Sequence, residues 1–352
     1  MNRRAFLGAT LLRPDALRRG VGYLWICQHT GGGWHSQTYG LLRSGQSLTP
    51  LIVNALLDAG ASPDDPRIRR AVAFLARHVS PEGAVGITAE DYPCYATALT
   101  LRVFVRTRNP LVPRLINWLR TQQMSPENGW QPAHEALGAW GIGGAPRTAP
   151  DSGHIDLSMT RHVLEGLAQA GISGADPAMR NAMVFVGRCQ NADGGFIFST
   201  VETGANKAGE TASGFASYAT TTADGLLSQI AAGATNTQPA LRWLQANDQP
   251  ELPAGFPSAA RERYAEGLRY YYADAATRAF RAAGCKRDVP FAKALAKRQL
   301  LNGSWQNAEP LVKEDDPLIA TALAVAALAN SYVCGTVSTR CCHGDVTGFG
   351  RR

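Results

Sequence analysis

The chain has 352 residues, 45% of them hydrophobic and 18% charged, so it can bury a large core and is not intrinsically disordered. The formal net charge of +7 is spread along the chain without a nucleic-acid-binding motif, which argues against a nucleic-acid partner. No run of about 18 apolar residues occurs, so the sequence contains no transmembrane segment.

The N-terminus, residues 1–14, has some features of an export signal. Arg3-Arg4-Ala5-Phe6-Leu7 resembles the start of a twin-arginine leader. The apolar stretch that should follow is interrupted by Arg13 and Asp15. Two interpretations stay open. A degenerate leader would export the protein, and a chance resemblance would leave it cytoplasmic.

From residue 15 to residue 335, one short pattern returns along the chain. A helical run ends in Gln, a Gly-bearing turn follows, and an aromatic residue closes the unit, as at Gln299, Gly303 and Trp305. The related segments are Cys27-Gln28 with Gly32-Gly33-Trp34, Gln122-Gln123 with Asn128-Gly129-Trp130, Cys189-Gln190 with Gly194-Gly195-Phe196, His78 with Gly83, and Asn247 with Gly255-Phe256. The repetition predicts one domain over residues 15–335, followed by a tail at residues 336–352.

Two kinds of helix alternate within this domain. Amphipathic, basic helices lead into the turns, and several begin with Asp before Pro, a typical start signal. Helices rich in Ala, Leu, Thr and Ser follow the turns and should be enclosed. Examples of the first kind are 65–75, 111–123, 176–190, 238–245 and 289–299, and the second kind is expected at 48–60, 95–104, 157–171, 218–232, 271–284 and 319–328. The alternation predicts an all-α fold, an (α/α)6 toroid of six inner and six outer helices.

The repeat of Gln with Gly-Ser-Trp, followed by a helix such as Thr321-Ala322-Leu323, resembles the superfamily of squalene–hopene cyclases, other terpene cyclases and protein prenyltransferase β-subunits. The resemblance covers about residues 20–335. It implies a toroid with an apolar, aromatic-lined central cavity that receives an isoprenoid chain.

The catalytic motifs of that superfamily are not found in this sequence. Class II terpene cyclases carry Asp-x-Asp-Asp, whereas Glu314-Asp315-Asp316-Pro317 lacks this spacing and is typical of a helix N-cap. Prenyltransferases hold zinc with Asp, Cys and His, but Thr211-Ala212-Ser213 stands where the Cys is expected. We therefore predict no cofactor and no metal.

The cysteines do not form a recognisable framework. Their number, seven, is odd, and most lie in apolar helical patterns, as is typical of reduced thiols. Cys341-Cys342-His343-Gly344 faintly resembles a zinc-binding segment of lanthipeptide cyclases. A ragged C-terminal tail is the favoured alternative.

Candidate site residues lie where the second kind of helix begins, a rim that faces the cavity mouth in the superfamily. His154 lies near Asp156 in the longest loop, and a His with a carboxylate can act as general acid or base. Asp156 and Asp316 are the candidate acids, and loop ties or helix caps are the alternative for all three. Tyr95, Tyr218, Tyr271 and Met159 are expected to line the cavity, with burial in the core as the alternative for the tyrosines.

Two functions therefore remain open. Because the catalytic motifs of the superfamily are not found, the sequence favours a repeat protein that binds an isoprenoid-like or other apolar small molecule, or a peptide, without catalysing a reaction. The alternative is an active terpene cyclase or prenyltransferase-like enzyme with an atypical acid at the cavity mouth. The ligand and the oligomeric state do not follow from the sequence.

Overall fold

The structure, a computed structural model, describes residues 3–86, 91–212, 214–285 and 288–332. Helix dominates these residues, which confirms the predicted all-α class. The described strands form one hairpin of β1 (Glu210–Thr211) and β2 (Gly214–Phe215). Within the same residues, no helix is long and apolar enough to cross a membrane.

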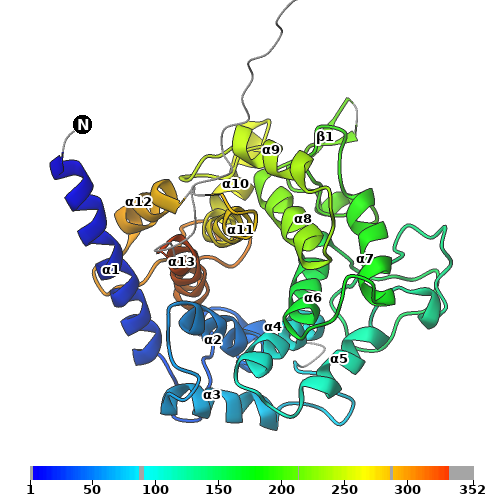
Figure 1. Cartoon of the computed structure of the whole chain (residues 1–352), viewed down its shortest axis with the longest axis horizontal. Helices are drawn as coiled ribbons and strands as arrows, with labels where there is room; N and C mark the ends of the chain where they lie inside the picture. The colour runs from blue at the N-terminus through cyan, green and yellow to red at the C-terminus, as the bar shows by residue number, and fades with distance from the viewer. Residues whose placement is uncertain (1–2, 87–90, 213, 286–287, 333–352) are drawn as a thin grey trace, which may run out of the picture.

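The helices form two concentric layers around a common centre (Figure 1). Each inner helix contacts the next along the chain, and α13 contacts both α11 and α2, so the described contacts close into a ring. The inner helices are α2 (Leu48–Asp58), α4 (Pro93–Arg106), α6 (Leu157–Gln169), α8 (Ala219–Ala231), α11 (Arg269–Ala282) and α13 (Pro317–Tyr332). The outer helices are α1 (Arg3–Ile26), α3 (Pro66–Arg77), α5 (Val112–Thr121), α7 (Pro177–Arg188), α9 (Gln238–Ala246) and α12 (Asp288–Arg298).

Local sequence explains why the two layers differ. Asp65 and Asp176 each precede a Pro and accept a hydrogen bond from the backbone N–H two residues later, which starts α3 and α7. The inner helices are rich in small side chains, and α13 buries alanines on several sides. Small residues let neighbouring helices approach closely, so the Ala-rich segments form the inner layer.

In several copies the repeated Gln fastens its turn to another outer helix. The side-chain amide of Gln28 donates to Gly32 O and to Arg67 O, both at 2.9 Å. Gln299 does the same with Gly303 O at 2.8 Å and Ala16 O at 2.9 Å. Each amide thus joins the carbonyl oxygen of its own turn to a carbonyl oxygen of another outer helix.

The closing tryptophans of the first and last units are each held by two hydrogen bonds. Trp34 donates its backbone N–H to Thr49 Oγ1 and its ring N–H to Leu24 O. Trp305 makes the equivalent bonds to Thr321 Oγ1 and Leu295 O. The indole thus joins the outer helix before the turn to the inner helix after it.

The third copy of the repeat is wrong in its sequence assignment, because Trp140 and not Trp130 occupies the closing position. Trp140 donates its backbone N–H to Thr160 Oγ1 at 3.2 Å and its ring N–H to Leu119 O at 2.7 Å. The amide of Gln123 reaches Gly138 O at 3.1 Å. The segment containing Trp130 is therefore an insertion between the Gln and its turn, and Trp130 packs against His134 instead.

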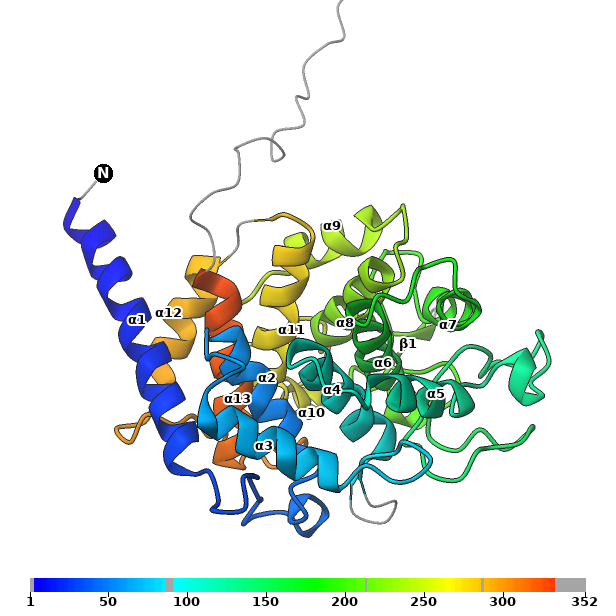
Figure 2. The same ribbon diagram turned by 60° about the horizontal axis from the view of Figure 1, so that its bottom comes forward.

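Two helices were not delimited in the sequence. α10 (Ala259–Gly267) directly precedes α11. α1 begins at Arg3, inside the segment interpreted as a leader, and continues to Ile26. It lies beside α12 in both views (Figures 1 and 2) and also contacts the inner helix α13, so the first described helix packs against the last two. The leader itself stays a prediction.

Candidate functional site

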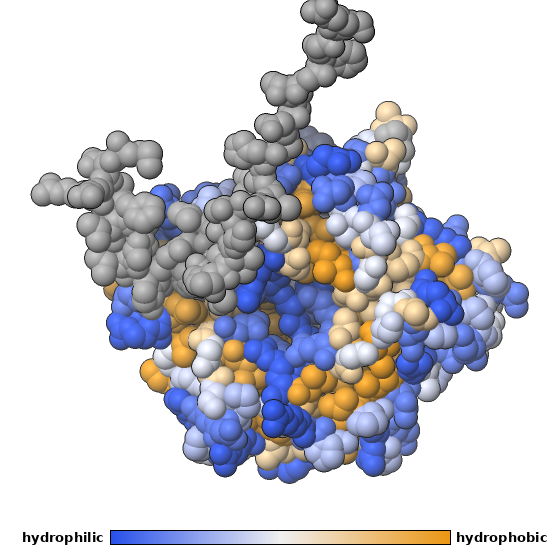
Figure 3. All heavy atoms as spheres, in the orientation of Figure 1, coloured by the Kyte–Doolittle hydropathy of each residue, from blue (hydrophilic) through white to orange (hydrophobic). Residues whose placement is uncertain are grey.

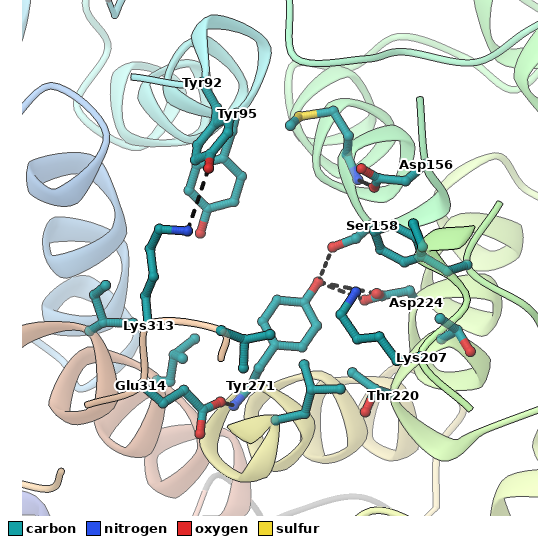
Figure 4. Close-up of a pocket in the computed structure, with 18 of the residues that line it drawn as sticks. Tyr92, Tyr95, Asp156, Ser158, Lys207, Thr220, Asp224, Tyr271, Lys313 and Glu314 are labelled. Carbon is teal, nitrogen blue, oxygen red and sulfur yellow. Dashed lines mark hydrogen bonds between the residues drawn. The ribbon is translucent and has the colours of Figure 1, made fainter. Parts of the chain in front are cut away.

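A central cavity of about 620 Å³ lies among the N-terminal ends of the inner helices (Figure 4). Its size is within the usual range for small-molecule pockets. Apolar side chains from α2, α6 and α13 and from the segments between helices make up most of its wall. They are Leu42, Leu48, Leu51, Ile142, Met159, Phe198, Leu268, Leu311, Val312, Ile319 and Leu323.

Most of the residues expected at the site line this cavity. They are Tyr95, Tyr218, Tyr271, Met159, His154 and Asp156. Asp316 is not among the lining residues, and it is almost fully buried. Its carboxylate accepts the backbone N–H of Leu318 at 2.8 Å and the hydroxyl of Ser36, so it caps the start of α13.

Asp156 also caps a helix. One carboxylate oxygen accepts the backbone N–H of Met159 at 2.6 Å, at the start of α6. The other lies 3.0 Å from His154 Nε2, and this hydrogen bond raises the pKa of the imidazole. The arrangement ties the loop to the helix at the cavity wall.

Asp224 on α8 is a site residue that the sequence analysis missed. It lines the cavity and is buried. Arg161 Nε donates to it at 3.0 Å, and the Tyr271 hydroxyl lies 3.1 Å from both of its oxygens. Burial raises the pKa of Asp224 to about 6. The Tyr271 hydroxyl also bonds to Ser158, as Figure 4 shows, so these side chains form a polar cluster in the wall of a mostly apolar cavity.

Next to this cluster, buried charged side chains of the inner helices form a network of ion pairs. Glu165 on α6 lies 2.8 Å from Arg161, 2.5 Å from Arg278 on α11 and 3.6 Å from Arg102 on α4. The three guanidinium groups hold the pKa of Glu165 far below its usual value. Figure 3 shows a hydrophilic hollow at the centre of the ring. The inner helices are thus linked by ion pairs between their side chains as well as by apolar contacts.

His162 lies among these charges without a hydrogen bond. Both ring nitrogens lack a partner among the described residues, and the side chain is buried. Burial and the neighbouring Arg161 lower the pKa of His162 well below its ordinary value. Its ring meets the Tyr95 ring edge-on at 4.7 Å between centroids. His162 is therefore neutral and packs as an aromatic side chain.

Metal ligation is not indicated in the part of the chain that the structure describes, where no group of three or more His, Cys, Asp or Glu side chains could hold an ion. Cys341-Cys342-His343 and the tail at 336–352 lie outside the described residues. The cysteines described as free thiols are Cys27, Cys94, Cys189 and Cys285.

Comparison with solved structures relates this ring to terpene cyclases. The type II terpene cyclase MstE from Scytonema, in complex with its substrate geranylgeranyl dihydroxybenzoate, is similar with a TM-score of 0.58 and 13% identity, over 92% of this chain and 98% of that chain. MstE with its product merosterolic acid A gives a TM-score of 0.60 at the same identity and coverage. A protein from Actinoplanes gives 0.59 at 16% identity, over 91% and 99%.

Sequence comparison alone gives no such relation. No protein-family model matches the chain, and none of the curated proteins matches it. At these identities the structural likeness concerns the fold and not the chemistry. The chain has the fold of the type II terpene cyclases.

Proposed function

We propose that this protein is an (α/α)6 toroid that binds an isoprenoid-like apolar ligand in its central cavity. The observation that carries the proposal is the cavity itself, which is about 620 Å³ in volume and walled mostly by aliphatic and aromatic side chains. MstE, which has a similar fold, binds a geranylgeranyl compound. The closed contacts of the inner helices and the Gln and Trp bonds support the toroid.

Filling the cavity tests the binding function. Met159→Trp adds a large side chain at the cavity wall and should weaken binding of farnesol or geranylgeraniol at least tenfold, because the added ring occupies the ligand volume. Leu301→Trp is the control, since Leu301 is fully exposed. Native mass spectrometry measures the bound fraction, and circular dichroism checks folding. Failure of the unmodified protein to bind either alcohol or an acid with the same isoprenoid tail would reject the proposal.

A second function, acid catalysis, is favoured by Asp224. A buried carboxyl with a pKa of about 6 carries a proton in weakly acidic solution. Tyr271 lies at the same place, and aromatic faces stabilise carbocations. In this proposal, protonated Asp224 donates to an alkene or epoxide of the bound chain and starts its cyclisation.

The catalytic alternative has a distinct pH dependence. Because Asp224 must be protonated to act, product formation should be greatest below about pH 6 and fall roughly tenfold per unit above it. Asp224→Asn should abolish the product, whereas Asp64→Asn, at an exposed position before α3, should not. Incubation with squalene, oxidosqualene and geranylgeranyl diphosphate, followed by mass spectrometry, provides the readout. If the unmodified protein forms no product across pH 5 to 8, the protein binds without catalysis.

A further inference from the structure

The cavity contains ammonium groups that no carboxylate among the described residues neutralises directly. Lys207 and Lys313 both line it. Lys207 Nζ lies 3.9 Å from the centre of the Phe198 ring, and Lys313 Nζ lies 3.5 Å from the Tyr92 hydroxyl. Among the described residues, neither ammonium has a carboxylate oxygen within 4.0 Å. Both side chains are half-buried, so each ammonium is partly removed from water without a carboxylate beside it to compensate.

The carboxylates that share the cavity already have other partners. Asp156 caps α6 and bonds to His154, and Asp224 is held by Arg161 and Tyr271. Glu314 accepts the backbone N–H groups of Tyr270 and Tyr271 at 2.9 and 2.7 Å, which caps α11. Since these carboxylates are bonded to other groups, neither lysine has a carboxylate of its own within the cavity.

The electrostatic surroundings of Lys207 indicate that the two lysines lack an anionic partner. Burial lowers the pKa of Lys207, and the charge of Lys313 lowers it further. Asp156 and Asp224 act in the opposite direction without overcoming burial. An anion placed between the ammonium groups would relieve their mutual repulsion and the cost of burying Lys207.

The backbone of Lys313 is consistent with a positioned side chain. Its φ of +69° lies in the left-handed region, which is costly for a residue with a Cβ. Hydrogen bonds from Lys313 N to Pro310 O and from Asp316 N to Lys313 O hold the turn in this conformation. Such conformations persist where the surrounding structure fixes them, and they concentrate at ligand sites.

We propose that Lys207 and Lys313 bind the anionic head group, a carboxylate or a phosphate, of an amphipathic ligand whose apolar chain occupies the rest of the cavity. This inference rests on the proposed function, because it assigns a head group to the same apolar ligand. Figure 4 shows Lys207 and Lys313 on different sides of Tyr271, with their side chains extending into the space that the tail would share. The ligand class is thus an acidic isoprenoid or a fatty-acid-like molecule.

Ligands with one common tail test the head group. Farnesol, farnesoic acid and farnesyl phosphate are titrated by calorimetry into the full-length protein at low ionic strength. We expect at least one of the anions to bind at least tenfold more tightly than the alcohol. Which anion binds more tightly identifies the head group. The preference should shrink at high salt only modestly, since a buried pair is weakly screened.

Variants separate this inference from the proposed function. Lys207→Gln and Lys313→Gln should each remove most of the preference for the anion and leave the affinity for farnesol within about twofold. Lys297→Gln, at an exposed position of α12, is the matched control. Unchanged farnesol binding also shows that each variant is folded. If the acid, the phosphate and the alcohol bind equally, or if both lysine variants keep the preference, the head-group site is rejected while the cavity function stands. If none of the ligands binds, the proposed function itself fails.

Discussion

Asp156 serves the backbone N–H of Met159 and the imidazole of His154 at the same time. Its side chain is nearly buried, whereas that of His154 is 36% exposed. The hydrogen bond favours the protonated imidazole and raises its pKa above the ordinary value of 6.5. A residue predicted as a catalytic acid thus has a clear structural use as a cap, and its catalytic role stays a prediction.

The pair makes stability depend on pH. Because the folded pKa of His154 is raised, its contribution is fully present below about pH 6.5 and is lost as the pH rises through the folded value. His154→Gln should therefore lower the unfolding free energy more at about pH 5.5 than at about pH 8.5. Urea unfolding measures both. His134→Gln is the control, since His134 makes no ion pair among the described residues. A His154→Gln effect that does not change with pH would contradict the assignment.

Helices and turns meet at glycines that any other residue would replace only with strain. A Cβ at Gly138 would lie 1.8 Å from Asn181 O on α7, and the φ of +91° is left-handed. Gly32 and Gly303 have the same relation to carbonyl oxygens of α3 and α1. The close approach lets the neighbouring Gln amide bond across to the next helix. Glycine at this position sets the spacing of the outer layer.

Two glycines of one loop distinguish the alternative positions for the third repeat. Gly129 and Gly138 both have positive φ, but only a Cβ at Gly138 would meet other atoms within 4 Å. Gly129→Ala should cost about 1 to 2 kcal/mol from the backbone conformation alone. Gly138→Ala should cost roughly 1 to 3 kcal/mol more, because α7 must move. Denaturant midpoints measure the difference. Equal losses of stability in the two variants would favour Trp130 as the closing residue of the third repeat.

Local patterns explain which elements the sequence could predict. Gln, Gly and the Asp-Pro starts act within a few residues of each other, so they predicted the outer helices other than α1, and the Ala-rich composition predicted the inner helices. The sequence predicted Trp130 as the closing residue in place of Trp140, because an inserted loop that contains Gly and Trp cannot be distinguished from the repeat turn by spacing alone. The cavity tyrosines followed from helix starts. Lys207 and Lys313 could not be assigned, since only the fold brings their loops together.

Asp224 was missed for a different reason. It is the one charged residue in α8, whose other residues are small, polar or apolar. That contrast is a signal in the sequence, because a charge within an enclosed helix needs a partner. Its partners, Arg161 and Tyr271, are 63 and 47 residues away along the chain. Their pairing depends on how the inner helices face one another, which no local pattern encodes.

At the scale of the molecule, the two ends of the described chain complete one structure. Gln299 on the C-terminal side bonds to Ala16, 283 residues earlier. α1 packs against both α12 and α13. A Cβ at Gly20 would lie 2.6 Å from the Trp305 ring and 2.8 Å from Val325, so α1 approaches the last turn of the repeat closely. The outer layer is therefore closed by a helix from each end.

Gly20 and Gly22 test this closure within one helix. Gly22 has no atom within 4 Å of an added Cβ, so Gly22→Ala should stabilise the protein by about 0.5 to 1 kcal/mol through helix propensity. Gly20→Ala should destabilise it by roughly 1 to 3 kcal/mol, because the methyl group displaces Trp305. Thermal unfolding of both variants provides the comparison. Stabilisation by Gly20→Ala would show that α1 does not dock on this surface.

The adjacency of α1 and α13 has a consequence for the nascent protein. The apolar sides of α1 and α2 gain their final neighbours only when α13 has emerged from the ribosome. Contacts between such distant segments make folding slow and leave aggregation-prone intermediates with exposed apolar surface during translation. Chaperone dependence should therefore be strongest late in synthesis, and ribosome-stalled products that stop before α13 should aggregate.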